Sequence, residues 1–434
     1  MAMDNAQGIV IIGGGMVGIS LALMLSKALS KTHPRMPIVL IEKCPFPEKN
    51  TTPSLQSSLD TRATALSAGS VKLLQDIDCW QALSHQAEPI SDIHISDRGH
   101  YAGTLLHASD YAVDALGYVV ENSALGQCLL QQLHATTVKC IAPATVEQCR
   151  FTRQGVELSL QQNNVSSELV SNEKNKILQA DLVLIADGAD SPLSKSLGIE
   201  TQTTQYQQSA IITNVALAKP HKGTAYERFT DQGPLALLPL GDRDGMHRAS
   251  VVWTRETKQI DGLMQLSDEG FLQQLQHCFG YRADHILQVG KRQVYPLQLL
   301  QATEQVRSHL VLMGNAAHFL HPVAGQGFNL SLRDCATLAS VLSSSATLPS
   351  SSSGSDCASE KYTTYTNLGD YKILKEYLSR RETDQQLTVG LTHALVNTFS
   401  SSKLSVSVLR QCGLLSLQAL PRVKTQLAQQ MMGM

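Results

Sequence analysis

Short runs of apolar residues, bounded by glycine-rich turns, divide the first part of the chain. The runs Ile9–Ile12 and Ile38–Ile41 are uniformly apolar and short, which is typical of buried strands. Between them, apolar residues recur with a helical pattern, at Ile19, Leu21, Ala22, Leu25 and Leu29. The pattern predicts a strand, a helix and a second strand, the opening unit of an α/β fold.

The middle of the chain follows a different pattern, in which short strand-like segments are separated by turn residues. From Ser209 to Thr254 we expect antiparallel strands at Ala210–Val215, Ala225–Phe229, Leu235–Leu240 and Ala249–Trp253. Val138–Leu160 also alternates, and the polar stretch Gln161–Lys176 is expected to be a hairpin tip. A β-sheet inserted between pieces of an α/β fold would form a lid over a second ligand.

The remaining patterns predict the connections. Asp60–Leu66 is expected to enter a helix, and Ile90–Ser96 to form a strand. The strand-like Tyr118–Asn122 and the helix after it should return the chain to the first sheet. Leu263–Phe279 is expected to be one helix.

Later segments continue the α/β pattern and then become helical. Asp181–Ala186 and Val311–Met313 are further buried-strand runs, the second followed by a helix that starts near Asn329. Ser343–Ser359 is rich in serine and is expected to be a loop. Helices are expected from Tyr371 and within Leu404–Met431, where the second could dock on the core or on a membrane or partner surface.

Composition and charge exclude several classes of protein. With 434 residues, a formal net charge of −2 and a pI near 6.7, the chain lacks the basic footprint of a nucleic-acid-binding protein. Its 9 cysteines have no CxxC spacing, which argues against a zinc ribbon and a disulfide scaffold. Ile9–Leu25 is short for a membrane span and holds glycines that a signal peptide would lack. We therefore expect a cytoplasmic protein, with contact to a membrane surface left open.

The first candidate site is the glycine motif after the first apolar run. Gly13, Gly15 and Gly18 have the spacing of a dinucleotide fingerprint, and Glu42 follows the second run. The first glycine permits the tight turn, the second lets amides reach a pyrophosphate and the third lets the helix pack on the strand. Because strand, loop, helix, strand and acid occur in register, the segment predicts a cofactor that contains ADP.

The second candidate site is the stretch Val311–Asp334. Its loop begins at Gly314-Asn315, and Gly325 and Gly327 lie where the next helix starts. Glycine amides at a helix N-terminus favour a flat ligand that carries negative charge. An ordinary strand–loop–helix connection with turn glycines is the structural alternative. His318 and His321 are too few to predict a metal site and could line the loop or serve packing.

Single residues elsewhere have both structural and functional interpretations. Arg62 could be a cation at a helix start or a contact to a phosphate or a flavin. Asp187, with Gly188 after it, could simply form a turn at a strand end or could bind the ligand.

Together these motifs resemble those of the class A flavoprotein aromatic hydroxylases. The general flavin motifs are GGGMVG, DTRATAL, ADGADS and GNAAHFLHPVAGQGFNL, and the likeness covers almost the whole chain except the serine-rich stretch. Within this group the chain is similar to the UbiH family of ubiquinone biosynthesis. That finer resemblance depends on HPVAGQGFNLSLRD, on ISDRGH at Ile95–His100 and on ERFTDQGPLALLPL at Glu227–Leu240.

The resemblance implies a binding residue set for FAD. Gly13, Gly15, Gly18 and Glu42 would hold the ADP half, and Arg62 and Asn122 would contact the middle and the flavin edge. The motif of Asp187 and Gly188 would lie near both FAD and the reduced nicotinamide. The remaining expected contacts come from Gly314, Asn315, Gly325, Gly327 and Asn329.

The chain departs from its relatives at two positions. Asn315 stands where most relatives have aspartate against the ribitol hydroxyls, so the hydrogen-bond acceptor is kept and the charge is lost. Ser194-Lys195 replaces an arginine that many relatives carry near the nicotinamide.

The resemblance also implies the reaction. NADPH or NADH would reduce FAD transiently, O2 would form a flavin hydroperoxide, and the oxygen would pass to the ring of a polyprenyl phenol, 2-octaprenyl-6-methoxyphenol. The expected catalytic residues are those of the loop beside the flavin ring, His321, Pro322, Gly325 and Gln326. Leu235, Leu237 and Pro239 are candidates for an apolar face over the ring, with sheet core as the alternative.

The expected fold is α/β, with a discontinuous Rossmann-like FAD-binding domain, an antiparallel β-sheet substrate domain and C-terminal helices. We assign residues 1–85, 110–200 and 298–342 to the first and 86–109 and 201–297 to the second. Residues 343–365 would be the serine-rich loop and 366–434 the helical region.

Other expectations concern partners and rival functions. An insoluble prenyl substrate implies peripheral contact with the inner membrane or a complex of ubiquinone-biosynthesis proteins, and no nucleic acid is expected. The rival functions are a sister hydroxylase acting at another ring position and an FAD-binding assembly subunit without turnover.

Overall fold

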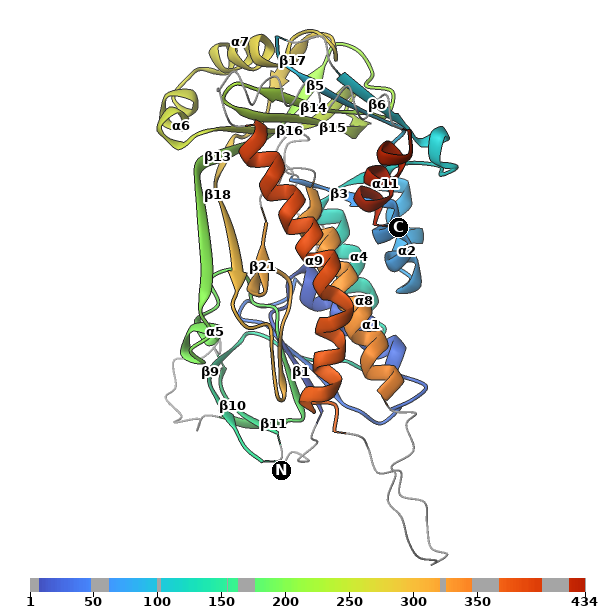
Figure 1. Ribbon diagram of the computed structural model, residues 1–434, viewed down its shortest axis with the longest axis vertical. Coiled ribbons are helices and arrows are strands. Elements are labelled where there is room, and N and C mark those ends of the chain that lie inside the picture. The colour runs from blue at the N-terminus through green and yellow to red at the C-terminus, as the bar shows by residue number, and fades with distance from the viewer. Residues whose placement is uncertain are drawn as a thin grey trace, which may run out of the picture.

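The protein is elongated, with one β-sheet layer at each end and long helices between them (Figure 1). The computed structural model describes residues 8–47, 62–99, 103–153, 155–162, 176–320, 325–345, 367–399 and 421–433.

The first layer is a parallel sheet built on the apolar runs. In the described part of the chain its strand order is β19-β20-β12-β1-β2-β8, and all pairs are parallel except that of the edge strand β19. The strands are β1 (Ile9–Ile12), β2 (Ile38–Ile41), β8 (Lys139–Ile141), β12 (Leu182–Ile185), β19 (Val306–Arg307) and β20 (Leu310–Leu312). Every residue of β1, β2 and β12 is buried, which confirms that these runs are interior strands.

Helices cover one face of this sheet. Figure 1 shows α1 (Met16–Leu29), α4 (Asn122–His134), α8 (Gln326–Ser345) and α9 (Tyr371–Phe399) running along one another. Leu21 and Leu25 of α1 are fully buried in the cluster that also holds Leu332 and Leu338 of α8. The opposite face packs on a small antiparallel sheet of β9 (Ala144–Phe151), β10 (Val156–Gln162) and β11 (Lys176–Ala180). The expected hairpin tip lies largely outside the described residues.

The second layer is a larger, mostly antiparallel sheet. Its order among described residues is β21-β18-β13-β16-β15-β14-β5-β6, with β17 (Ile286–Val289) paired to β13. The strands are β5 (Asp92–Asp97), β6 (Gly103–His107), β13 (Thr201–Leu217), β14 (Thr224–Thr230), β15 (Gly233–Arg243), β16 (Met246–Glu256), β18 (Gln293–Ala302) and β21 (His318–Phe319). The long strands β13 and β18 extend from this layer towards the first (Figure 1). The two layers together confirm the expected α/β fold with an antiparallel sheet.

Two helices close the outer face of the second sheet. The single helix expected over Leu263–Phe279 is instead α6 (Thr257–Met264) followed by α7 (Asp268–Phe279). The break occurs at Ser267, whose hydroxyl accepts a hydrogen bond from the Gly270 amide and caps α7.

A third, small sheet corrects one further expectation. β3 (Ala63–Ser67) pairs with β7 (Gly117–Glu121), and β7 with β4 (Glu88–Ile90). Ala63–Leu66 is therefore a strand, because pairing with β7 outweighs the helical preference of its alanines; the helix α2 (Ala68–Asp76) starts only afterwards. After β7 and α4 the chain returns to the first sheet at β8, as expected, while β7 itself belongs to the small sheet.

Shorter elements complete the fold. They are α3 (Trp80–Leu83), α5 (Pro192–Ser196), α11 (Pro421–Met432) and the 3-10 turns at Ser84–Gln86, Ala108–Tyr111 and Gly314–Ala316. α11 confirms part of the expected C-terminal helix, and its Ala428 and Met432 are buried with Leu240 of β15. Most of the serine-rich stretch lies outside the described residues. Among the helices that the structure describes, none combines the length and apolar character that a membrane span requires.

A buried charge network fastens α9 to α8. Asp334 of α8 accepts hydrogen bonds from His318 Nε2 at 2.7 Å, Arg381 Nε at 2.6 Å and Gln385 Nε2 at 3.1 Å. Both carboxylate–cation pairs are almost fully buried. Burial raises the pKa of Asp334, but the hydrogen bonds and charges of His318 and Arg381 outweigh it and hold that pKa below its ordinary value.

We predict that Asp334→Asn lowers the free energy of unfolding by about 3–5 kcal/mol, because it leaves Arg381 buried beside a neutral amide. Denaturant unfolding at pH 7 measures the change. The control Glu376→Gln, in an exposed pair with Arg380, should change it by less than about 1 kcal/mol. Equal, small effects of both substitutions would contradict the buried network. Because the folded pKa is depressed, the difference between wild type and Asp334→Asn should persist at neutral pH and shrink in acid, as pH falls below about 4.

Candidate functional site

The glycine motif forms the tight contact between β1, α1 and the end of β12. Gly13 has a φ of +107°, and a Cβ there would lie 2.5 Å from the Ala186 carbonyl oxygen and 2.8 Å from the Asp187 Cα. A Cβ on Gly18 would lie 1.8 Å from the Gly13 carbonyl oxygen. Both positions therefore require glycine for packing, as the fingerprint predicts.

Gly15 is different, because nothing in the described structure requires glycine there. Its φ of −72° is open to any residue, and a Cβ would meet no atom within 4 Å. Beside it, Glu42 accepts hydrogen bonds from the Gly14 amide at 2.5 Å and from the Cys44 amide at 3.0 Å. The turn thus presents bare backbone at the N-terminus of α1, next to a carboxylate fixed at the end of β2. This cradle fits a pyrophosphate and its ribose.

The loop of the second candidate site, which begins at Gly314-Asn315, lies against the same turn. Gly314 has a φ of +58°, and a Cβ there would lie 3.0 Å from the Val17 side chain. The amide of the preceding residue, Met313, donates to the Ile185 carbonyl at 2.8 Å. Asn315 is exposed at the same turn. Three glycine-containing segments, at residues 13–18, 187–188 and 314–315, therefore meet at one edge of the parallel sheet.

Asp187 and Gly188 form the middle turn of this meeting point. Burial raises the pKa of Asp187, and a hydrogen bond from the Ser191 hydroxyl at 2.8 Å opposes the increase. Gly188 has a φ of +105°, and a Cβ there would meet no atom within 4 Å.

The start of α8 is fixed by an asparagine. Asn329 is buried: its Nδ2 donates to the carbonyls of Ala65 and Gly325 at 2.9 and 2.8 Å, and its Oδ1 accepts from the Ser67 amide at 2.9 Å. These bonds tie Gly325, whose φ is +60°, to β3. The Asn329 side chain therefore positions the loop through hydrogen bonds to backbone atoms.

The other residues of this loop differ in their surroundings. Gln326 is buried and donates to the Met431 carbonyl of α11 at 3.4 Å, while Gly327 faces open space. His321 and Pro322 lie outside the described residues.

Arg62, just before β3, and Asn122, just after β7, lie at the same end of this antiparallel pair. The Asn122 amide donates to the Arg62 carbonyl at 2.9 Å, and Asn122 Oδ1 accepts from the Thr64 hydroxyl at 2.6 Å. The Arg62 guanidinium is exposed and donates to the Tyr295 hydroxyl of β18 at 3.2 Å. Arg62 thus connects the small sheet to the large one.

The apolar face expected from Leu235 and Leu237 points the other way. Both pack with Trp253 and with Phe271 of α7, on the outer face of the large sheet. Leu238 and Leu240 alternate with them and pack in a cluster with Ile90 of β4 and Ala428 of α11, on the inner face of the large sheet. The sheet-core alternative is therefore the one observed for Leu235 and Leu237; Pro239 is buried without a place in either cluster.

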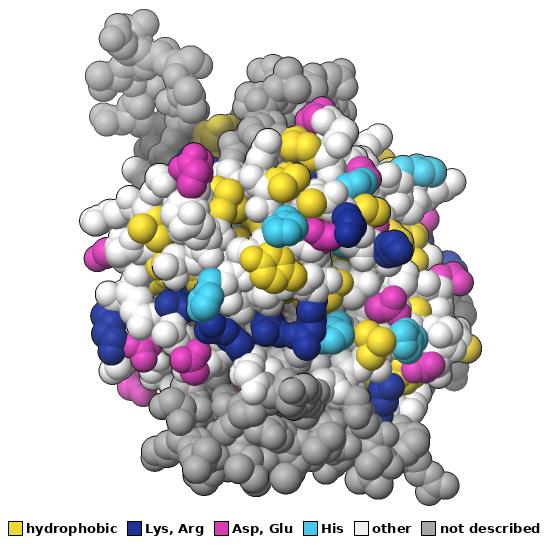
Figure 2. Space-filling view, turned by 90° about the horizontal axis from the view of Figure 1, so that it is seen from above, with side chains coloured by type: hydrophobic (Ala, Val, Ile, Leu, Met, Phe, Trp, Pro, Cys, Tyr) yellow, Lys and Arg dark blue, Asp and Glu magenta, His cyan; other side chains and the backbone are white. Residues whose placement is uncertain are grey.

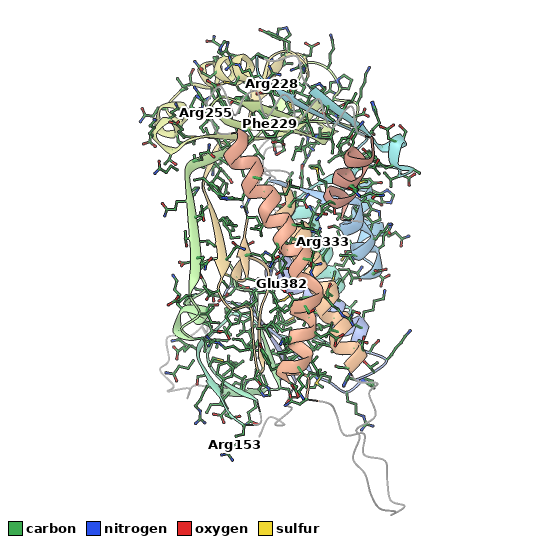
Figure 3. The ribbon with its side chains drawn as sticks, in the orientation of Figure 1. Arg153, Arg228, Phe229, Arg255, Arg333 and Glu382 are labelled. Carbon is green, nitrogen blue, oxygen red and sulfur yellow. The ribbon has the colours of Figure 1, made fainter. Side chains whose placement is uncertain are left out.

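Polar contacts join the inner face of the sheet to the small sheet. Arg248 of β16 donates to Glu121 Oε1 at 2.9 Å in a largely buried ion pair. Glu121 is the residue directly before Asn122. Figure 3 places Arg228, Phe229 and Arg255 in the large-sheet layer, with Arg333 and Glu382 along α8 and α9. The outermost surface of that layer carries a band of Lys and Arg side chains with several histidines (Figure 2). The inner face of the layer is the one that carries the contacts to the small sheet.

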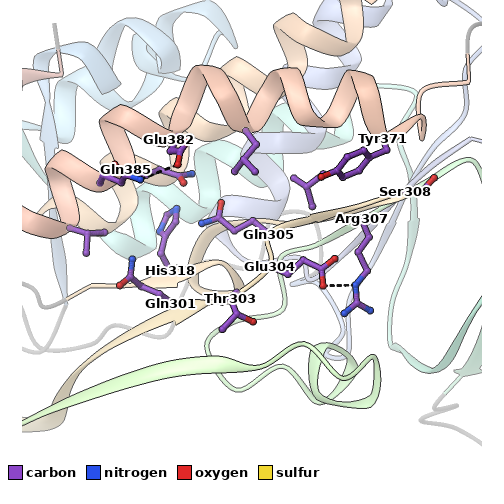
Figure 4. A pocket seen from close by; sticks show the side chains of 15 residues that line it. Gln301, Thr303, Glu304, Gln305, Arg307, Ser308, His318, Tyr371, Glu382 and Gln385 are labelled. Atoms are coloured by element: carbon purple, nitrogen blue, oxygen red, sulfur yellow. Dashed lines mark hydrogen bonds and ion pairs between the residues drawn. The ribbon is translucent and has the colours of Figure 1, made fainter.

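A polar cavity of about 700 Å³ lies elsewhere, between α9 and the loop that joins β18 to β19 (Figure 4). His318, expected to line the flavin loop or to pack, forms part of its wall and donates to Asp334 from β21. None of the glycine turns lines this cavity. The cavity is therefore not part of the site that the glycine segments form.

Sequence reasoning missed the residues that join the layers. Tyr295, Glu121 and Arg248 were not singled out, although Arg248 is a charged residue at the start of an otherwise apolar strand pattern. Its partner is 127 positions away in sequence, so no local pattern identifies the pair.

Comparison with known proteins agrees with this geometry. Residues 7–361 match the FAD binding domain family. Ubiquinone hydroxylase UbiL of Rhodospirillum rubrum is 32% identical over 99% of this chain and 90% of its own length. The 3-demethoxyubiquinol 3-hydroxylase of Escherichia coli is 29% identical over 98% of each chain.

Solved structures show the same fold. p-Nitrophenol 4-monooxygenase PnpA from Pseudomonas putida DLL-E4 superimposes with a TM-score of 0.71 at 18% identity, covering 99% of both chains. The chain therefore belongs to the FAD binding domain family and, within it, to the class A FAD-dependent aromatic-ring monooxygenases of the ubiquinone-biosynthesis group.

Proposed function

We propose that the meeting point of the glycine turns holds the ADP half of FAD. Gly13, Gly15 and Gly18 would form the turn, with the pyrophosphate over the bare backbone at Gly15 and the ribose on Glu42. The observation that carries this assignment is the contrast between the glycines. Gly13 and Gly18 are required by packing, whereas the space at Gly15 is open.

The remaining contacts would follow the cofactor along the molecule. Asp187, Gly188, Gly314 and Asn315 would contact its middle, where Asn315 supplies an uncharged acceptor. Arg62 and Asn122 would lie nearer the flavin ring. This supports the proposed division into an FAD-binding domain and a β-sheet substrate domain, which meet at Arg62–Tyr295 and Glu121–Arg248.

The loop before α8 would lie beside the flavin ring. Bound FAD supplies the redox chemistry, accepting a hydride from NADH or NADPH and activating O2. Amides of Gly325, Gln326 and Gly327 at the α8 N-terminus favour negative charge on the bound ring, and Asn329 holds them in place. His321 and Pro322 complete the proposed loop.

We propose a polyprenyl phenol as substrate, namely 2-octaprenyl-6-methoxyphenol. Two of the three segments on which the finer resemblance depends lie side by side: β5 pairs with β14, with Ile95 opposite Glu227. This places both at one part of the large sheet, whose inner face would cover the ring and exclude water. A sister reaction at another ring position is the second candidate, since a relative of full coverage is named a 3-demethoxyubiquinol 3-hydroxylase.

An insoluble substrate also implies where the protein works. We propose that it acts in the cytoplasm, in peripheral contact with the inner membrane or in a complex with other proteins of the pathway.

Gly15→Ala is expected to fold normally but to raise the Kd for FAD at least about tenfold, because its methyl group occupies the approach of the pyrophosphate. Flavin fluorescence titration measures Kd, and thermal unfolding measures folding. Gly18→Ala, the matched control, should lose stability by about 1–3 kcal/mol or more, since its Cβ clashes with the Gly13 carbonyl. A Gly15→Ala protein that binds FAD as tightly as wild type would contradict the assignment.

Turnover separates an enzyme from an assembly subunit. The purified holoenzyme should oxidise NADH or NADPH faster when a short-chain 2-prenyl-6-methoxyphenol is added, and product analysis should show one added oxygen on the ring. Unstimulated oxidation with no hydroxylated product would favour the assembly subunit. A product formed only from 3-demethoxyubiquinol would favour the sister reaction.

Co-sedimentation with lipid vesicles tests the membrane proposal. The holoenzyme is expected to sediment with vesicles that contain polyprenyl phenol. Protein that stays in the supernatant at every lipid concentration, with and without pathway partners, would contradict it.

A further inference from the structure

Glu227 is a carboxylic acid on the inner face of the large sheet. Its neighbours Tyr226 and Arg228 face outwards: the Tyr226 ring contacts Phe279 of α7, and Arg228 donates to the Cys278 carbonyl at 3.3 Å. Because side chains alternate along a strand, Glu227 points to the opposite face. Ala225, which shares that face, belongs to the apolar cluster against which Ala63 of β3 and Ala68 of α2 pack.

The strand register places Glu227 in a row that crosses the sheet. Ile95 of β5, Ala236 of β15 and Val252 of β16 are successive partners on either side of it. The row continues to Ile212 of β13 and Gln293 of β18. All six side chains of the row are partly accessible.

The neighbouring row on the same face is closed by comparison. Phe229, Pro234, Thr254 and Ala210 follow one another across β14, β15, β16 and β13, and all are buried. The accessible row is therefore bordered on one side by a closed row. It is apolar except for a carboxyl group and an amide, which suits an aromatic ring that carries a hydroxyl.

The band ends next to the predicted flavin contacts. Gln293 accepts a hydrogen bond from the Tyr295 hydroxyl at 2.7 Å, and that hydroxyl accepts one from Arg62 at 3.2 Å. Along β16, Arg248 on the same face is paired with Glu121, the residue before Asn122. Glu227 thus lies on a surface that is joined at two points to the segment where the flavin is proposed to bind.

No described residue forms a hydrogen bond or ion pair with the Glu227 carboxylate. Ionisable side chains of the described strands on this face include Asp97 of β5, Arg248 and Glu256 of β16 and Tyr295 of β18. Glu121 and Arg62 reach the same face from the small sheet. None of these groups contributes to the shift in the pKa of Glu227. Burial alone raises the pKa of Glu227 to about 7, although part of the side chain stays accessible. A carboxyl that is surrounded by protein, accessible and without a described partner is expected to meet a ligand.

We propose that Glu227 is the hydrogen-bond acceptor and general base for the phenolic hydroxyl of the substrate. The proposal rests on the proposed function. In the step, the phenolic O–H bond breaks, the proton passes to a Glu227 oxygen, and the electron pair stays on the substrate oxygen and is delocalised into the ring. The ring carbon becomes more nucleophilic towards the oxygen atom that O2 supplies, while NAD(P)H provides the two electrons that release the second atom as water. Glu227 returns its proton to solvent when product leaves.

The raised pKa of Glu227 suits it to accept a proton from a phenol. A phenol has a pKa near 10, so an ordinary carboxylate near 4 is a weak base for it. A base that titrates close to neutral pH shares the proton more evenly in the transition state. The same burial that raises this pKa makes the ionised form costly to the folded protein.

The decisive variant is Glu227→Gln, which keeps shape and removes the base. We expect kcat for ring hydroxylation to fall about 100-fold or more, within the usual effect of general base catalysis. Wild-type activity should rise as pH passes through about 7, and this rise should be absent from Glu227→Gln. Glu227→Asp should restore part of the rate and the pH dependence. Glu256→Gln, in an exposed pair with Lys258, is the matched control and should behave as wild type.

Binding without turnover gives an independent measurement. Calorimetry at pH 8 should show that wild type prefers a short-chain prenylphenol to its O-methyl ether by about tenfold, as a hydrogen bond to a charged acceptor provides. Glu227→Gln should lose most of this preference while its Kd for FAD is unchanged. Its melting temperature relative to wild type should also increase from pH 5.5 to pH 8.5, because ionised Glu227 destabilises the fold as pH rises through its raised pKa.

The outcomes separate the two proposals. If wild type neither binds nor hydroxylates any prenylphenol, the proposed function fails and this inference fails with it. If wild type does both and Glu227→Gln matches it in rate, pH profile and ligand preference, the assignment of Glu227 alone is overturned.

Discussion

The structure depends on one close approach of backbone to backbone. At Gly18 a side-chain carbon would overlap the Gly13 carbonyl, and at Gly13 it would overlap the turn after β12. Both contacts exist only because these residues have no Cβ. They bring the start of α1 against β1 and set the end of β12 beside them. Gly314 then packs on Val17, so the later segment joins the same edge.

This constraint explains how a discontinuous domain can form one site. The segments are distant in sequence, but each contributes a parallel strand whose carboxyl end lies at the same edge of the sheet. The long strands β13 and β18 then carry the chain to the second layer, which faces the site through its inner surface. The ion pair Arg248–Glu121 and the contact Arg62–Tyr295 fix that surface relative to the small sheet. The buried pair of Asp334 and Arg381 holds α9 along α8.

Local patterns were sufficient for the strands of the first sheet and for the glycine motif. Ile9–Ile12 and Ile38–Ile41 are observed with the predicted bounds because a uniformly apolar run has few other stable positions. The same reasoning failed for Ala63–Leu66, where pairing with β7 decided the structure. It left β15 undecided, since Leu235, Leu237, Leu238 and Leu240 make both faces of that strand apolar and the pattern cannot choose between them. Glu227 belongs to one of the motifs of the finer resemblance, but its burial depends on neighbouring strands that are distant in sequence. The roles of the individual site residues remain predictions, and His321 and Pro322 lie outside the described residues.

The central claim is that the three glycine turns bind one FAD molecule together. Hydrogen–deuterium exchange of the protein, stripped of flavin and then reloaded with FAD, tests it directly. The account predicts that FAD slows amide exchange at residues 13–18, 187–190 and 314–316 in parallel, with the same dependence on FAD concentration. Protection confined to one of these turns, with the other two unchanged at saturating FAD, would contradict it.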